Sequence, residues 1–260
     1  MRLFFIISFL FLFSVSQASP LDAESDNLFF KANRLYFNGD FEAAVTTYKS
    51  ILKDYKPELF FNSKSCGELF YNIGNCYFRL EKNGEAVLNY ERALLFIPRD
   101  ADLKYNIKYL QDIIEDDIVE KENIISDIFG VKFFSRTELA LLFCLVNFLL
   151  FLFLSLRFFL KKEWTFYFVN IFFIFWIVSG LFFGVMLKET VFDHRAVILE
   201  KEVDILAGPD QRDTLLFKVH EGTMVHHERD ESGFSLIRLS DGKRGWLISS
   251  AIKSIMPANN

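Results

Sequence analysis

The chain has 260 residues, of which 52% are hydrophobic and 33 are phenylalanines, and its formal net charge is −5 at pH 7. This mildly acidic balance gives no basic footprint for nucleic acid, so we expect no nucleic-acid partner. Cys66 and Cys76 lie on one predicted helix about 15 Å apart at 1.5 Å rise per residue, and Cys144 lies in an apolar stretch. The sequence therefore predicts neither a disulfide framework nor a metal site.

The first residues have the pattern of an export signal. A positively charged start, Met1-Arg2, precedes an apolar core from Leu3 to Val15, and Ser16-Gln17-Ala18 then offers a small-x-small cleavage site. This predicts a signal peptide over residues 1–18 that is cleaved after Ala18. The alternative is an uncleaved anchor, and in both cases the segment that follows is exported.

The segment between Phe70 and Pro98 matches the tetratricopeptide-repeat pattern W-x2-L-G-x2-Y, A-x3-F, P. Small residues stand where two antiparallel helices cross closely, aromatic rings fill the space between them, and a proline ends the second helix because it has no N–H. The motif residues are Gly74, Tyr77, Ala86, Tyr90, Ala93 and Pro98. The alternative is an ordinary amphipathic helical hairpin.

A weaker copy of the same pattern comes earlier in the chain. Leu28, Ala32, Ala44 and Tyr48 fall on the template, with a turn at residues 38–40. After the stronger copy, Asp100 is a typical N-cap for a helix over residues 101–114. We therefore expect an all-α helical-repeat domain over residues 22–114, with two repeats and a capping helix that covers the open end.

By resemblance to this repeat family, ligands lie against the first helix of each repeat. The candidate partner-binding residues are Asn33, Tyr36, Tyr71, Asn75, Arg79 and Asn106. Asn75 has the groups to hydrogen-bond an extended peptide backbone, and Arg79 can pair with a carboxylate. For Asn75 the alternative is a role in the fold itself. The lysines of a carboxylate clamp are missing, which argues against specificity for a C-terminal carboxylate.

Two further apolar stretches, residues 137–158 and 164–187, are long enough to cross a bilayer. A juxtamembrane linker over residues 115–136 precedes them. The link between the stretches carries Arg157, Lys161 and Lys162, which places it in the cytoplasm by the positive-inside bias. Both ends of this transmembrane hairpin then face outward, in agreement with the export signal. The alternative is two buried core helices.

From about residue 194 the pattern changes to short alternating runs with glycine-centred turns. The turn at 220–223, the Asp241-Gly242 hairpin and Trp246 resemble the bacterial Src homology 3 (SH3) barrels, so we expect an all-β SH3-like small barrel over residues 194–256. Trp246 is expected to pack across it. Phe234-Ser235-Leu236 stands where such barrels often carry Gly-Trp-Tyr, which weakens the case for a preformed peptide groove. No metal site is expected at His226-His227, because neighbours in a strand face opposite sides.

This order of segments resembles the exported tetratricopeptide-repeat proteins of the Bat (Bacteroides aerotolerance) group, the BatE family. The sharpest elements are residues 71–77, residues 90–94 and the hairpin at 241–246. The resemblance implies a multidomain protein of the inner membrane, with its repeats and SH3-like barrel in the periplasm. It also implies partners among membrane-anchored von Willebrand A-domain Bat proteins and, indirectly, a MoxR-type ATPase, with a role in aerotolerance or envelope stress.

We expect a protein-binding scaffold rather than an enzyme. The exported parts contain no nucleophile elbow, no recognisable pair of carboxylates and no neighbouring cysteine–histidine pair. No catalytic residue or cofactor is therefore assigned. The alternative function is a cell-wall receptor in which the SH3-like barrel binds peptidoglycan, and retention of the tail on purified sacculi distinguishes the two.

Overall fold

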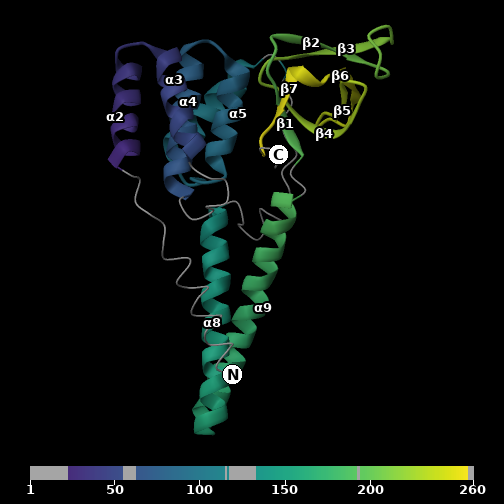
Figure 1. The fold of residues 1–260 in the computed structure, drawn as a ribbon. Coiled ribbons are helices and arrows are strands. Elements are labelled where there is room, and N and C mark those ends of the chain that lie inside the picture. Colours follow the sequence, from purple (N-terminus) through teal and green to yellow (C-terminus); the bar gives the residue numbers. More distant parts are fainter. Residues whose placement is uncertain (1–22, 55–62, 115, 117–132, 192–193, 257–260) are drawn as a thin grey trace. The chain divides into compact units, whose positions relative to one another are not determined.

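The computed structural model describes residues 23–54, 63–114, 116, 133–191 and 194–256. They belong to two compact units (Figure 1). One unit contains two long apolar helices, and the other contains five shorter helices and an antiparallel sheet. The signal peptide expected over residues 1–18 and most of the expected linker over 115–136 lie outside the described residues.

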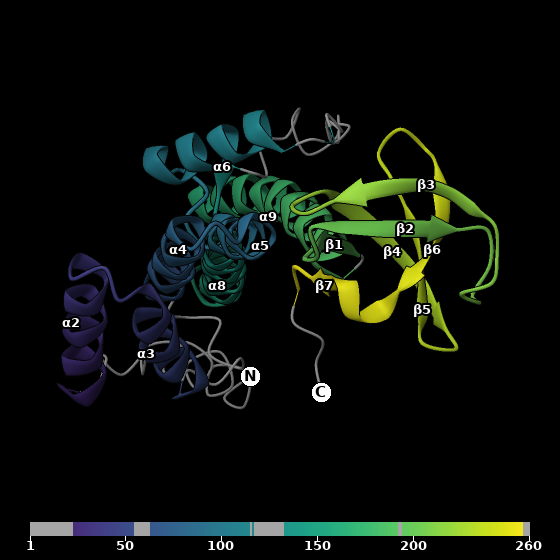
Figure 2. The ribbon, with the colours of Figure 1, turned by 90° about the horizontal axis from the view of Figure 1, so that it is seen from above.

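The helices of the second unit form two hairpins followed by a single helix (Figures 1 and 2). They are α2 (Ala23–Phe37), α3 (Phe41–Asp54), α4 (Ser63–Arg79), α5 (Asn83–Leu94) and α6 (Ala101–Ile113). The turn between α2 and α3 lies at the expected residues 38–40. Gly39 has φ +83°, a conformation that costs glycine little, and the Asp40 carboxylate accepts a hydrogen bond from the Ala43 amide at 3.3 Å.

The end of α5 and the start of α6 follow from local chemistry. The Ile97 amide donates to the Ala93 carbonyl at 2.9 Å. The next bond of the helical ladder would come from residue 98, and Pro98 has no N–H to give. Two residues later, the Asp100 side chain accepts a hydrogen bond from the Leu103 amide at 2.8 Å, so the expected N-cap of α6 is present.

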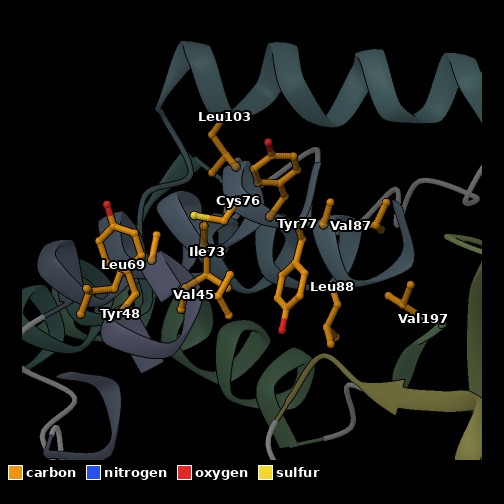
Figure 3. Close-up of a cluster of buried hydrophobic side chains, with 14 of the residues drawn as sticks. Val45, Tyr48, Leu69, Ile73, Cys76, Tyr77, Val87, Leu88, Leu103 and Val197 are labelled. Atoms are coloured by element: carbon orange, nitrogen blue, oxygen red, sulfur yellow. The ribbon is translucent and has the colours of Figure 1, made fainter. Parts of the chain in front are cut away.

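Small residues and tyrosines meet in the core of the helical part, as expected from the motif. A Cβ on Gly74 would lie 2.5 Å from the Tyr90 ring, so only glycine fits there without a shift of the ring. The four alanines at 32, 44, 86 and 93 are fully buried. Figure 3 shows the cluster, in which Tyr48 and Tyr77 lie among buried aliphatic side chains such as Ile73 and Leu88.

The described C-terminal residues form one seven-stranded antiparallel sheet in the order β3-β2-β6-β5-β4-β1-β7. Its strands are β1 (Arg195–Ile198), β2 (Glu202–Leu206), β3 (Leu215–His220), β4 (Met224–Glu231), β5 (Phe234–Arg238), β6 (Arg244–Ile248) and β7 (Ile252–Ser254). A short 3-10 turn, Ser249–Ala251, joins β6 to β7. Between β5 and β6 the turn glycine, Gly242, has φ +95°, as expected of the Asp241-Gly242 hairpin.

Trp246 is buried as expected, with 6% of its surface exposed, but it is not part of the aliphatic cluster that contains the fully buried Leu247. Neighbouring strand residues face opposite sides of a sheet, so Leu247 and Trp246 are on different faces. On its own face, Trp246 has the Arg229 guanidinium 5.1 Å from the centre of its ring.

The sheet and the helical part share a core, which the sequence analysis did not foresee. Val197 of β1 and Ile255, just after β7, are fully buried in the helical cluster. In Figure 3, Val197 continues the row of side chains beyond Leu88 and Val87. The helices and the sheet, although separated in sequence by the two long helices, are therefore packed as one folded unit.

Polar contacts at the start of α5 reinforce this joint. The N-cap position, Lys82, makes no side-chain cap, and the Gly84 amide instead donates to the Glu221 carboxylate of the sheet at 2.8 Å. A carboxylate beside a helix N-terminus is favourable because the first amides are otherwise unpaired. Further along, the Arg195 guanidinium lies 3.2 Å from the buried Glu91 carboxylate.

Asp116 joins the sheet to the segment after α6. Its carboxylate accepts hydrogen bonds from the Thr223 hydroxyl at 2.6 Å and from the His220 amide at 2.7 Å. Burial raises the pKa of Asp116, but these hydrogen bonds outweigh burial and hold the pKa below its usual value. The contact therefore stabilises the fold at neutral pH, and this contribution is lost as the pH falls through the lowered pKa.

The other unit contains α8 (Arg136–Leu160) and α9 (Glu163–Val191). Phenylalanine rings stack between them, Phe143 on Phe183 at 5.0 Å and Phe153 on Phe168 at 4.9 Å between centroids. A capping box at Ser135 and Glu138 starts α8. Residues 137–160 and 163–188 are long and apolar enough to cross a membrane.

Candidate binding surface

The candidate partner-binding residues lie on three helices of the helical part. Asn33 and Tyr36 are on α2, three of the others are on α4, and Asn106 is on α6. Each of these side chains is half-buried except Arg79, which is exposed. Five of them form two clusters, and Asn33 lies in neither.

The first cluster surrounds Asn75 and brings together four side chains. The Asn75 side-chain oxygen accepts hydrogen bonds from the Tyr90 hydroxyl at 2.7 Å and from the Asn106 amide nitrogen at 3.1 Å. That nitrogen is also 3.3 Å from the Tyr71 hydroxyl, and the Tyr71 and Tyr90 rings are 5.9 Å apart. The structure thus joins three of the predicted residues, Tyr71, Asn75 and Asn106, and adds Tyr90, which the sequence analysis had assigned to the core.

Asn33 repeats part of this arrangement in the first hairpin. Its side-chain oxygen accepts a hydrogen bond from the Tyr48 hydroxyl, at the same spacing of 15 residues as Asn75 and Tyr90. Burial raises the pKa of both Tyr48 and Tyr90, so their hydroxyls remain protonated donors at neutral pH. The two asparagine oxygens therefore serve the fold, the alternative that the sequence left open for Asn75. Within the described part of the chain, the Asn75 amide nitrogen has no acceptor.

The second cluster contains Tyr36 and Arg79, with Phe41 between them. The Arg79 guanidinium lies 5.4 Å from the centre of the Phe41 ring, and the Tyr36 and Phe41 rings are 5.3 Å apart. Burial raises the pKa of Tyr36, and the positive charge of Arg79 offsets part of that increase. No described carboxylate pairs with Arg79, so its charge is open to a ligand.

Four aromatic residues on this surface were missed by the sequence analysis. Phe41 supports Arg79, and Phe78 of α4 packs edge-on against Tyr109 of α6 at 5.8 Å between centroids. Tyr105 is 69% exposed and Tyr109 is 47% exposed. The spacing of four between them was a visible signal for a shared helix face.

The surface thus offers hydrogen-bond donors, aromatic rings and the Arg79 guanidinium, which has no carboxylate partner among the described residues. Such groups bind an extended polypeptide. The thiols nearby add no reactive group, because burial raises the pKa of Cys66 to about 11 and of Cys76 to about 12. Among the described residues no cluster of histidine, cysteine, aspartate and glutamate has the arrangement of a metal site.

The fold and this surface define a chain of mixed helix and antiparallel sheet, with two helices apolar enough to span a membrane. Comparison with protein-family models and with curated proteins finds no match to this chain.

Proposed function

We propose that the protein is a membrane-anchored interaction scaffold whose folded unit lies on the periplasmic side of the inner membrane. In this proposal α2–α6 are tetratricopeptide repeats with a capping helix, and the sheet is an SH3-like barrel. The scaffold belongs to a Bat-type complex, with von Willebrand A-domain membrane proteins as direct partners and a MoxR-type ATPase as an indirect one. The sequence motifs at residues 70–98 and 241–246 support this assignment.

The observation that carries the proposal is the core shared by segments on both sides of the two long helices. Val197 and Ile255 follow α9 in the sequence, yet they are buried among helices that precede α8. Segments that fold together are on one side of a membrane, so the two helices cross it as a hairpin. The cationic link at residues 157–162 favours a cytoplasmic position for the turn, which leaves the folded unit outside.

The partner-binding surface in this proposal is the face formed by α2, α4 and α6. Arg79 pairs with a carboxylate of the partner, and the Asn75 amide nitrogen donates to its backbone. The exposed rings of Tyr105 and Tyr109 supply apolar contact area. The Asn75 oxygen is already used by Tyr90, so a partner meets a surface that is ordered in advance.

Reversing the charge of Arg79 tests this surface. We expect Arg79→Glu to reduce the co-purified partner by roughly 10-fold, because a like charge replaces the ion pair. The matched control is Lys53→Glu, since both residues are basic and lie in the last turn of a helix. The measurement is quantitative mass spectrometry of proteins that co-purify from mild detergent. An unchanged partner after Arg79→Glu, or an equal loss after Lys53→Glu, would contradict the proposed surface.

The cell-wall alternative is favoured by apolar side chains exposed on the sheet. Leu215, Leu216 and Ile248 are each at least 40% exposed. Under this alternative the protein is retained on purified sacculi and Arg79→Glu leaves the retention unchanged, whereas the scaffold predicts no retention.

A further inference from the structure

An open cavity of about 500 Å3 lies at the end of the apolar hairpin where α8 turns into α9. Its lining residues come from the last two turns of α8 and the residue after them: Leu154, Arg157, Phe158 and Lys161. The volume falls in the range of sites that hold small molecules. Two of its lining residues are apolar and two are cationic.

No acidic side chain among the described residues neutralises the cationic residues of the cavity. Arg157, Lys161 and Lys162 form no ion pair with any residue that the structure describes, and Glu163 is the one acidic residue in this turn. The Arg157 guanidinium is held 4.9 Å from the centre of the Phe166 ring of α9, which limits where it can move. Lys161 has a left-handed backbone, with φ +43°, at the end of α8. Two fixed backbone positions four residues apart therefore supply two positive charges to one cavity.

The apolar side and its surroundings match the boundary of a bilayer. Phe158 and Phe159 are each more than two thirds exposed, and Trp164 and Tyr167 of the first turns of α9 are also exposed. Aromatic rings of this kind gather at the level of lipid headgroups, and a long arginine side chain reaches the same level from a buried backbone.

We propose that this cavity binds the headgroup of an anionic phospholipid. The phosphate lies between Arg157 and Lys161, and an acyl chain runs along Leu154 and Phe158. This inference rests on the proposed membrane location of the hairpin. Inorganic phosphate would offer the same charged group to Arg157 and Lys161. It has no acyl chain, however, to contact Leu154 and Phe158. The combination of charge and apolar surface therefore favours a lipid, because basic residues beside a membrane attract anionic headgroups.

The experiment uses the full chain purified in mild detergent and titrated with phosphatidylglycerol, phosphatidylcholine or inorganic phosphate. Bound lipid is measured by native mass spectrometry, and stabilisation is measured by thermal unfolding. We expect phosphatidylglycerol to bind and to raise the unfolding temperature, and we expect neither effect from phosphatidylcholine or inorganic phosphate. Equal effects of the two lipids, or an effect of inorganic phosphate equal to that of phosphatidylglycerol, would overturn the proposal.

Variants locate the site. The double substitution Arg157→Gln with Lys161→Gln is expected to weaken phosphatidylglycerol binding roughly 30-fold, from the contribution of a basic residue near an anionic lipid surface. Lys188→Gln, at the other end of the hairpin, is the control and should bind as the native chain does. If the double variant does not fold, Arg157→Gln and Lys161→Gln are measured singly. Each is expected to weaken phosphatidylglycerol binding roughly 5-fold, and native binding in both would overturn the site.

The same preparation separates this inference from the proposed function. A native chain that fails to fractionate with membranes contradicts the membrane anchor, and the lipid site with it. A native chain that fractionates with membranes but shows no preference for the anionic lipid contradicts the lipid site alone.

Discussion

Replacing Gly84 with alanine is expected to lower the free energy of unfolding by about 2 kcal/mol, a typical cost of overpacking. A Cβ at this position would lie 2.4 Å from the Ile198 carbonyl oxygen and 3.0 Å from the Leu199 Cα. Both are main-chain atoms of the sheet, which cannot rotate away as a side chain can. Alanine favours a helix over glycine by about 1 kcal/mol. The expected loss in the free energy of unfolding is therefore the cost of the clash minus this gain.

The check is urea unfolding of the full chain in mild detergent, followed by circular dichroism. Gly67→Ala is the matched control, because its Cβ would meet the Ile97 side chain at 2.8 Å, and that side chain can turn aside. We expect the control to lose less than half as much stability as Gly84→Ala. A Gly84→Ala chain as stable as the native one would mean that the sheet does not rest on the start of α5.

Replacing Arg92 with methionine is expected to cost about 3 kcal/mol or more, since hydrogen bonds from a charged donor contribute about 1.5–3 kcal/mol each. The Arg92 guanidinium donates to the Ile255 carbonyl at 2.9 Å and to the Ser254 carbonyl at 2.7 Å. Burial lowers the pKa of Arg92, and the nearby Glu85 partly offsets this. Methionine keeps much of the volume and leaves both carbonyls without these donors.

Hydrogen exchange of the full chain locates the effect of this change. We expect the amides of β7 and of residues 255–256 to exchange faster in Arg92→Met, while α2 and α3 keep their native rates. Arg34→Met, at an exposed position in the last turn of α2, is the control and should leave β7 unchanged. Native exchange rates in β7 of Arg92→Met would show that the guanidinium does not hold the end of the sheet.

Much of the local structure could be predicted because it depends on neighbouring residues. The turn glycine Gly39, the cap Asp100 and the hairpin glycine Gly242 each perform the role that their sequence context indicates. Pro98 ends the hydrogen-bond ladder of α5 for the reason that its chemistry gives. The separation of Trp246 from the aliphatic cluster could not be predicted in this way, because alternation tells which residues share a face and not which face meets that cluster.

The joint between helices and sheet depends on residues far apart in the chain. Asp116 meets His220 across 104 positions, and Arg92 meets the Ile255 carbonyl across 163. A single sequence holds no signal for such pairs. The buried Glu91 looks like any polar residue on a helix surface until its partner Arg195 is known.

Only part of the binding surface could be predicted, because some of its contacts form only when different helices pack together. The resemblance to the repeat family singled out Tyr71, Asn75 and Asn106, which do come together. It did not show that the Asn75 oxygen is already occupied by the Tyr90 hydroxyl, since that bond needs the two helices packed. Nor did it show that the exposed Arg79 is supported by a ring from another helix, Phe41.

The central claim is that helices and sheet form one unit outside the membrane, joined to it by a hairpin whose turn is inside. Single cysteines at Lys104, Ser250 and Lys162 test it directly, because Lys104 is exposed on α6, Ser250 is exposed on the sheet and Lys162 lies in the turn. The measurement is labelling by a membrane-impermeant maleimide in intact spheroplasts, with the native chain as background. We expect labelling of Lys104→Cys and Ser250→Cys in intact spheroplasts, and of Lys162→Cys only after the membrane is disrupted. Labelling of Lys162→Cys from outside, or of only one of the other two, would contradict the account.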